Sequence, residues 1–171
     1  GLSFRNGNNS TNDGGGLFVE VGDATITIEN CIFTNNGAYD NGGCVNAESE
    51  SGGTIFFRYN TVSGTNHADN GAGGAIRINA RPDGIVYFEY NTIAGVNSAD
   101  ASGGALNINT ADNGTIYIRN NSFTGTNTST SVGGAFYANT AGDGTLVISG
   151  NTVNGTNTGT RGGGIYANTS S

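Results

Sequence analysis

The amino-acid sequence predicts an all-β fold: a right-handed parallel β-helix, or β-solenoid, forming one domain over residues 1–171. Two observations predict it. Glycine pairs recur about every 30 residues, and one apolar residue recurs with the same period further along each repeat. Two markers that keep one period indicate stacked structural repeats. We therefore expect five to six coils of about 30 residues, each with three short strands. The glycine pairs begin at Gly14, Gly42, Gly73, Gly103, Gly133 and Gly162, and the apolar markers are Phe33, Val62, Ile93, Phe123 and Val153.

The first strand of each repeat follows the glycine pair. In AIRIN, at 75–79, apolar Ile76 and Ile78 alternate with polar Arg77 and Asn79. Alternation with period two is typical of a strand with one buried face, so the two isoleucines are expected to point into the coil. The matching inward pairs are Leu17 and Val19, Val45 and Ala47, Leu106 and Ile108, Phe136 and Ala138, and Ile165 and Ala167.

A tight turn and a second strand follow. RPDG, ADNG and AGDG place Asp, Asn and Asp before a glycine, which favours a turn. The chain then bends at an asparagine and enters a short third strand, and a polar loop leads to the next glycine pair. The expected inward pairs of the second strand are Ile26 and Ile28, Ile55 and Phe57, Val86 and Phe88, Ile116 and Ile118, and Leu146 and Ile148. The bend residues are Asn60, Asn91, Asn121 and Asn151, whose side chains can stack as an amide ladder.

Stacking places equivalent residues of successive coils in columns. On the outer face of the second strand one column alternates in charge, as expected because opposite charges attract across neighbouring strands. The charged column is Glu29, Arg58, Glu89 and Arg119. A neighbouring column contains Phe56, Tyr87 and Tyr117, a candidate surface for carbohydrate or a partner protein. Aromatic residues also simply suit a pleated surface, and that alternative stays open.

The composition limits the class of partner. The net charge of -7 and the pI near 4.3 argue against nucleic acid and against an anionic membrane face. No apolar run approaches the roughly 20 residues of a membrane span, so membrane insertion is not expected. The sequence shows neither a signal peptide nor an initiator Met. We expect a mature extracellular or cell-surface protein, or a piece of a longer one.

Several residues are candidates for covalent or metal chemistry. Cys31 and Cys44 can form a disulfide in an oxidising compartment or remain two buried thiols. Seven Asn-x-Ser/Thr sequons occur, and in a secreted protein they become candidate glycosylation sites. The candidates are Asn9, Asn113, Asn120, Asn127 and Asn154, with further sequons at Asn8 and Asn168.

Acidic residues precede four of the glycine pairs. If the loops stack, Asp13, Asp40, Asp69 and Asp100 form a column of like charge, which a cation would relieve. We therefore expect weak calcium binding at Asp40, Asp69 and Asp100, unless flexible loops hold the acids apart in water. No other cofactor is expected.

The sequence offers little for catalysis. Pectate lyases and polygalacturonases share this architecture, but architecture alone does not transfer activity. The best candidate cluster is Arg77 and Arg81 with Asp83, yet Asp83 occupies a turn position, equivalent to Asn113 and Asp143. We expect no enzymatic activity. A polysaccharide-binding or polysaccharide-degrading β-helix is the alternative.

A second alternative is an ice-binding solenoid, because a regular array of threonines could form a flat ice-binding face. The array is suggested by Thr124-Gly125-Thr126, Ser63-Gly64-Thr65 and Asn154-Gly155-Thr156, and Ala94 and Val96 interrupt it.

The repeat resembles a known family. GGAI at 73–76 and GGAL at 103–106, together with FTNN at 33–36, resemble the repeats of the polymorphic outer membrane proteins of chlamydiae and related bacterial β-helix passengers. The resemblance implies a surface-exposed or secreted solenoid that acts as an adhesin or scaffold.

The two ends complete the functional expectation. Neither end of the sequence shows a capping helix or a charged plug, so open strand edges are expected at both. The expected function is therefore structural: a filament subunit that stacks head to tail, or a stalk segment of an adhesin. The expected partners are other copies, with glycans or a neighbouring cell surface as further partners.

Overall fold

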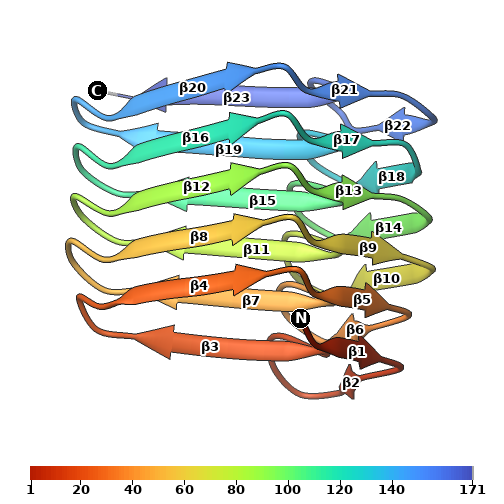
Figure 1. Cartoon of the computed structure of the whole chain (residues 1–171). Coiled ribbons are helices and arrows are strands. Elements are labelled where there is room, and N and C mark those ends of the chain that lie inside the picture. Colours follow the sequence, from red (N-terminus) through yellow and green to blue (C-terminus); the bar gives the residue numbers. More distant parts are fainter. Residues whose placement is uncertain (171) are drawn as a thin grey trace.

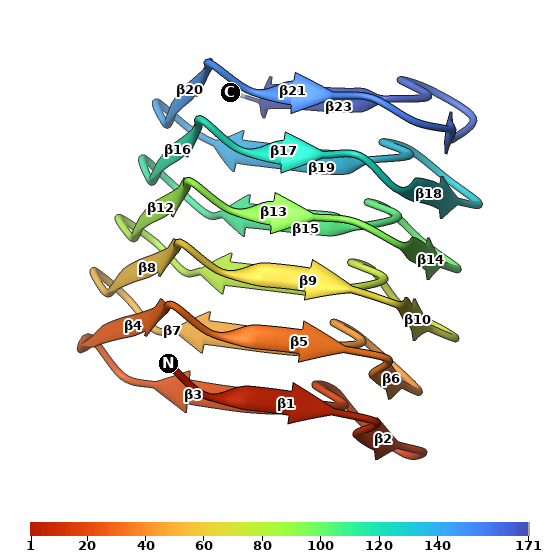
Figure 2. The same ribbon diagram turned by 45° about the vertical axis from the view of Figure 1, so that its right-hand side comes forward.

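The computed structural model describes residues 1–170, and within that range the chain forms 23 β-strands and no helix. The strands stack in successive coils from the N-terminus to the C-terminus (Figure 1). Every strand pair is parallel, and paired strands lie about one 30-residue repeat apart in the sequence. In Figures 1 and 2 the front strands run to the right as the chain rises and the strands behind run to the left. The β-solenoid is therefore right-handed, and the predicted fold class is confirmed.

Four sheets form the sides of the coil. Sheet C contains the expected first strands: β3 (Leu17–Val21), β7 (Val45–Ser49), β11 (Ile76–Ala80), β15 (Leu106–Thr110), β19 (Phe136–Ala141) and β23 (Ile165–Ser170). Sheet D contains the second strands: β4 (Thr25–Glu29), β8 (Thr54–Arg58), β12 (Ile85–Glu89), β16 (Thr115–Arg119) and β20 (Thr145–Ser149). Sheet A contains the third strands: β1 (Ser3–Arg5), β5 (Ile32–Thr34), β9 (Thr61–Ser63), β13 (Thr92–Ile93), β17 (Ser122–Phe123) and β21 (Thr152–Val153).

Sheet B was not expected. The segment predicted to be a polar loop contains a fourth short strand in each coil, so three strands per coil is corrected to four. Its strands are β2 (Asn8–Asn9), β6 (Gly37–Ala38), β10 (Thr65–Ala68), β14 (Val96–Ala99), β18 (Thr126–Ser129) and β22 (Asn157–Thr158). Its inward residues are an asparagine and a small residue, as in Asn66 with Ala68, so no apolar alternation marked it in the sequence.

The predicted inward columns form the core. Ile76 pairs with Val45 on one side and with Leu106 on the other, and Val86 pairs in the same way in sheet D. Phe57 and Phe88 are fully buried, and their rings stack 5.2 Å apart. Burying a side chain of this size contributes about 1.5–3 kcal/mol. The core is thus a continuous apolar rod built by vertical repetition.

Two internal asparagine ladders connect the coils. The predicted ladder lies at the bend between sheets D and A, where Asn60 Nδ2 donates to Asn91 Oδ1 and Asn91 Nδ2 donates to Asn121 Oδ1. Each rung also accepts a backbone hydrogen bond, for example from Asn60 N–H to Asn91 Oδ1 at 2.9 Å. The second ladder, in sheet B, consists of Asn36, Asn66, Asn97, Asn127 and Asn157. Both ladders satisfy amides that would otherwise be costly to bury.

Candidate functional site

The outer face of sheet D carries the two columns predicted from the sequence. Glu89 pairs with Arg58 below and with Arg119 above, which is the expected alternation. Arg58 Nε lies 2.9 Å from a Glu29 carboxylate oxygen, and Arg119 lies 3.6 Å from Glu89. These groups are partly exposed, so each pair contributes at most about 1 kcal/mol and helps mainly to fix the register.

The aromatic column is also present. The ring of Tyr87 lies 4.9 Å from Phe56 on one side and 4.9 Å from Tyr117 on the other, with nearly parallel planes. Arg119 lies over the Tyr117 ring at 4.0 Å, a cation–π contact. Because both faces of Tyr87 are covered by its neighbours, the column offers ring edges to solvent. Sugar stacking requires a free ring face, so this arrangement favours the structural interpretation of these residues.

The candidate catalytic cluster has a different composition from the expected one. Arg77 forms an ion pair with Glu48, which Arg81 also approaches at 3.9 Å, and Arg81 Nε lies 3.6 Å from Glu50. Burial alone would raise the pKa of Glu48. The hydrogen bond from Asn46 and the charges of Arg77 and Arg81 outweigh burial and lower it. The two arginines are therefore engaged with Glu48 in β7 and with Glu50, which directly follows β7.

Asp83 belongs to a turn instead. It has a positive φ of 60°, as has the equivalent Asn113, whose Nδ2 lies 3.4 Å from Asp83 Oδ1. The left-handed backbone explains why Asp and Asn occur here. Arg77, Arg81 and Asp83 are thus not a mutually hydrogen-bonded set in the structure.

The column of aspartates is broken by the register. Asp100 N–H donates to Ala68 O, which places Asp100 beside Asp69. Asn70 N–H donates to Tyr39 O, so the residue beside Asp40 is Asn70 rather than an aspartate. In residues 1–170 no group of three or more Asp, Glu, His or Cys is arranged to hold a metal ion. Asp69 and Asp100 are neighbours, but Asp40 lies outside their column, so the three expected calcium ligands do not form one cluster.

Both cysteines are buried free thiols, so the disulfide left open by the sequence does not form in the structure. The Cys44 thiol donates to Asn66 Oδ1 at 2.9 Å and lies 3.7 Å from Asn36 Nδ2, beside the second ladder. Burial raises the pKa of the Cys44 thiol to about 12. Cys31 lies at the lower end of the first ladder, where its thiol contacts the Glu29 carbonyl.

The glycosylation candidates separate by accessibility. Asn113, Asn120 and Asn154 are exposed, whereas Asn9 is half-buried, with its amide bonded to the Asp13 carbonyl. Asn127 is fully buried in the second ladder, where its Nδ2 donates to the next asparagine. A glycan on Asn127 is incompatible with this fold, so the prediction of a glycosylation site at Asn127 is wrong.

The threonine array does not form one flat surface. Gly125 lies at the corner after β17, and Thr126 begins β18, so Thr124 and Thr126 belong to different sides of the coil. The equivalent Gly64 and Gly155 have positive φ, as expected at a corner. Ice binding by Thr-Gly-Thr repeats on one plane is therefore not supported by the geometry.

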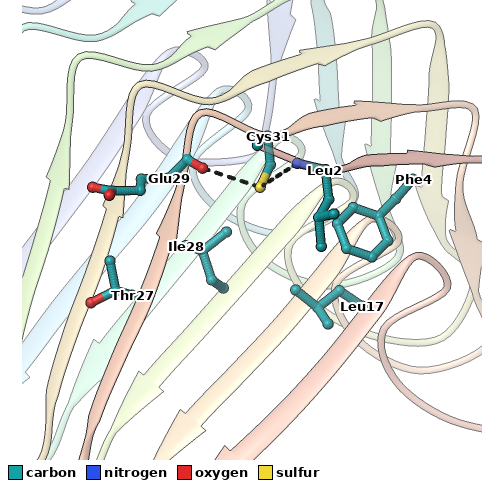
Figure 3. Close-up of a pocket in the computed structure, with 8 residues that line it drawn as sticks. Leu2, Phe4, Leu17, Thr27, Ile28, Glu29 and Cys31 are labelled. Carbon is teal, nitrogen blue, oxygen red and sulfur yellow. Dashed lines mark hydrogen bonds between the residues drawn. The ribbon is translucent and has the colours of Figure 1, made fainter.

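The ends of the solenoid hold the surfaces that remain unpartnered. At the N-terminal end, a cavity of about 360 Å³ opens below β4 (Figure 3). It is bordered by apolar side chains, and the Cys31 thiol lies at its rim, bonded to the Leu2 N–H and the Glu29 carbonyl. Its lining residues are Gly1, Leu2, Phe4, Leu17, Thr27, Ile28, Glu29 and Cys31. At the other end, inward-facing Ile148 and Ile165 are 37% and 38% exposed, although equivalent residues in the central coils are fully buried.

Sequence reasoning missed two features of this architecture, the second ladder and the N-terminal cavity. The ladder has a signal, because its asparagines recur with the repeat period and a small residue follows two positions later. The cavity has no such signal, since its lining residues come from β1, β3 and β4 and their flanks, which no short sequence pattern connects.

Comparison of the chain with protein-family models, with curated proteins and with solved structures found no match. Among residues 1–170 there is no helix that is long and apolar enough to cross a membrane.

Proposed function

We propose that the chain is a non-enzymatic, extracellular structural solenoid, serving as a filament subunit or as a stalk segment of a surface adhesin. The observation that carries the proposal is the match between its two end faces. Sheets A, B and C each begin and end with strands of the same register, so a second solenoid can continue them in parallel. This is a heterologous, non-closing contact of the kind that builds fibres.

The geometry of such a stack follows from the columns. Ile165 of the lower solenoid would lie under Leu17 of the upper one, and Val153 would lie under Phe4, so apolar core meets apolar core. These side chains are partly exposed in the single chain. Their burial would supply the driving force, at roughly 25 cal/mol per Å² of apolar surface removed from water.

The weakly charged exterior supports a structural role outside the cell. Only 11% of the residues are charged, and stacked aromatic rings and arginine–glutamate pairs occupy much of sheets C and D. The resemblance to passenger-type repeats points in the same direction. The polysaccharide and ice-binding alternatives have less support, because the ring faces are covered and the threonines are divided between two sides.

Sedimentation velocity over a range of protein concentrations, with electron microscopy of the same samples, tests the proposal. We expect rods that lengthen with concentration. Ile165→Lys should abolish the lengthening, because it places a charge in the apolar end face. Asn168→Lys, on the outer face of the same strand, is the matched control and should leave assembly intact. Monodisperse single solenoids at the highest concentration, for the unmodified chain, would contradict end-to-end assembly.

A further inference from the structure

The corner between sheets D and A carries an exposed column of its own. The residue that follows each of β4, β8, β12 and β16 has a positive φ, and its N–H donates to the coil above. In Figure 2 these bends lie one above another. Tyr59 and Tyr90 occupy the two central positions, where they are 52% and 49% exposed and their rings stack 5.1 Å apart. The corner column is Asn30, Tyr59, Tyr90 and Asn120.

This corner and the outer face of sheet D beside it concentrate aromatic side chains on one side of the solenoid. Four of the seven tyrosines lie here. Tyrosine and arginine are the residues that protein–protein interfaces favour. A ring that offers only its edge cannot stack on a sugar, but it can pack against another protein. We call this surface the tyrosine face: Phe56, Tyr59, Tyr87, Tyr90 and Tyr117, with the charged column Glu29, Arg58, Glu89 and Arg119.

The charged column of the tyrosine face is complementary to its own reverse. From the lower coil upward its members are Glu29, Arg58, Glu89 and Arg119, so the signs alternate. A second copy, inverted about a twofold axis between the coils of Arg58 and Glu89, places all four charges opposite charges of the other sign. An upright copy at the same height places each charge opposite its like. Charge complementarity therefore selects a second copy in the antiparallel orientation.

The same twofold axis aligns the corner column. Tyr59 of one copy faces the partner's Tyr90, and Tyr90 faces the partner's Tyr59, so four half-exposed rings meet at the centre. Asn30 faces the partner's Asn120 at each edge. Central tyrosines are typical hot spots of binding energy, whereas exposed charge pairs contribute little affinity each. The tyrosines thus supply the apolar burial, and the charged column sets the orientation.

We propose that the tyrosine face binds the same face of a second copy, which gives a side-by-side antiparallel dimer. The contact is isologous and closes on itself, because each copy contributes the same residues. It uses side chains on one side of the solenoid and no strand edge. The dimer is therefore independent of end-to-end assembly.

Sedimentation velocity tests the pairing in a chain that carries Ile165→Lys, so that end-to-end growth does not contribute to the mass. We expect a monomer–dimer equilibrium for this chain. Glu89→Arg and Arg58→Glu, each added singly, should raise the dimer dissociation constant by about tenfold, because each change brings two pairs of like charges face to face. A chain that stays monomeric at the highest concentration without either change would overturn the proposal.

Mixing the two charge variants distinguishes a surface contact from damage to the fold. In an equimolar mixture, the two central arginines of one chain face the two central glutamates of the other, so dimerisation should return to the level of the parent chain. Arg161→Glu makes the same change of charge at an exposed residue outside the tyrosine face, and it should leave the dissociation constant unchanged. Two variants that stay monomeric when mixed would refute the charge register.

Disulfide trapping reports the orientation. Asn30→Cys and Asn120→Cys are made separately in a Cys31→Ala chain, which leaves the fully buried Cys44 as the other thiol. In the antiparallel dimer the two new thiols face each other. The two copies of residue 30, in contrast, lie three coils or about 14 Å apart, beyond the reach of a disulfide. We expect a disulfide-linked dimer from the mixture of the two variants and little from either alone. Efficient trapping of Asn30→Cys with itself, or none in the mixture, would refute the antiparallel pairing.

Discussion

Cys44 shows how the buried polar residues constrain one another. Its thiol hydrogen-bonds Asn66 in the second ladder, and its side chain has no solvent exposure. Burial disfavours the thiolate strongly, which is why the pKa rises from 9.0 to about 12. The residue behaves as a small apolar side chain with one useful donor, and its oxidation to a disulfide would require local unfolding.

This pKa shift predicts a loss of stability at alkaline pH. In the unfolded chain the thiol ionises near its ordinary pKa of 9.0, whereas in the folded chain it stays protonated until about pH 12. The contribution is fully present below pH 9 and is lost as the pH rises toward 12, by about 1.4 kcal/mol per unit from this group. Urea unfolding at pH 8, 9, 10 and 11 should show a steeper decline for the unmodified chain than for Cys44→Ser. Parallel declines would show that Cys44 does not control the pH dependence.

The corner glycines show a second constraint at the residue scale. Gly95 has φ of +83°, and a Cβ there would lie 2.1 Å from the Gly64 carbonyl oxygen of the coil below. Gly95→Ala should therefore cost at least about 2 kcal/mol in unfolding free energy, from the left-handed backbone and the clash together. Gly22→Ala is the matched control, because nothing lies within 4 Å of its Cβ position. Its change should stay within about 0.5 kcal/mol, and equal losses in both variants would contradict the close approach.

At the scale of the element, sheet B differs from the other three sheets in what holds it. Its strands have almost no apolar side chains, and their inward positions are asparagines whose amides bond vertically. Neighbouring coils differ by one residue at the corner between sheets A and B. One residue, Asn35, connects Thr34 to Asn36, whereas two residues, Gly64 and Thr65, connect Ser63 to Asn66. Even so, Asn36 and Asn66 occupy the same rung. The ladder therefore tolerates variation in the corner that precedes it.

Removing one rung should be costly. In Asn97→Leu, Asn66 Nδ2 loses one of its two acceptors and keeps only the Ser63 carbonyl, and Asn127 Oδ1 loses its donor; both groups stay buried. Each unsatisfied group costs about 1–3 kcal/mol, so a loss of roughly 2–5 kcal/mol is expected in chemical denaturation. Asn70→Leu, at an exposed loop position, is the matched control and should change stability little. A similar small loss in both variants would mean that the ladder contributes register rather than stability.

Most of the strands could be predicted from the sequence because apolar alternation and the repeat period agree. The inward columns, the charge alternation and the first ladder all follow from one alignment. Sheet B could not be predicted in this way, since Asn97 with Ala99 resembles a polar loop. The prediction of an aspartate column was wrong for a related reason. Loop lengths vary by one residue between coils, so Asp40 lies beside Asn70, although the glycine pairs and the apolar residues both keep the repeat period.

At the scale of the whole molecule, the solenoid is nearly one-dimensional, because each coil contacts chiefly the coil above and the coil below. Its free energy of unfolding should then be the sum of a contribution from each coil and a contribution from each contact between neighbouring coils. Residues 76–105 make one full turn, from the start of β11 to the residue before β15. Ala75 and Ala105 are equivalent, since they directly precede Ile76 and Leu106, which pair with each other. Deleting one full turn therefore leaves every sheet continuous.

We expect the chain lacking residues 76–105 to fold cooperatively, with unchanged β-sheet circular dichroism per residue and a lower urea midpoint. Deleting 76–90 instead removes β11 and β12 but keeps the rest of that coil, and this chain should fail to fold.

The full-turn deletion also places Arg58 next to Arg119, because Glu89 between them is gone. Arg119→Glu should then stabilise the shortened chain, yet it should destabilise the full-length chain by creating a Glu–Glu contact. A difference of about 1 kcal/mol between the two backgrounds is expected from cross-strand charge pairs. The same sign of effect in both backgrounds would refute the vertical register on which the stacked columns depend.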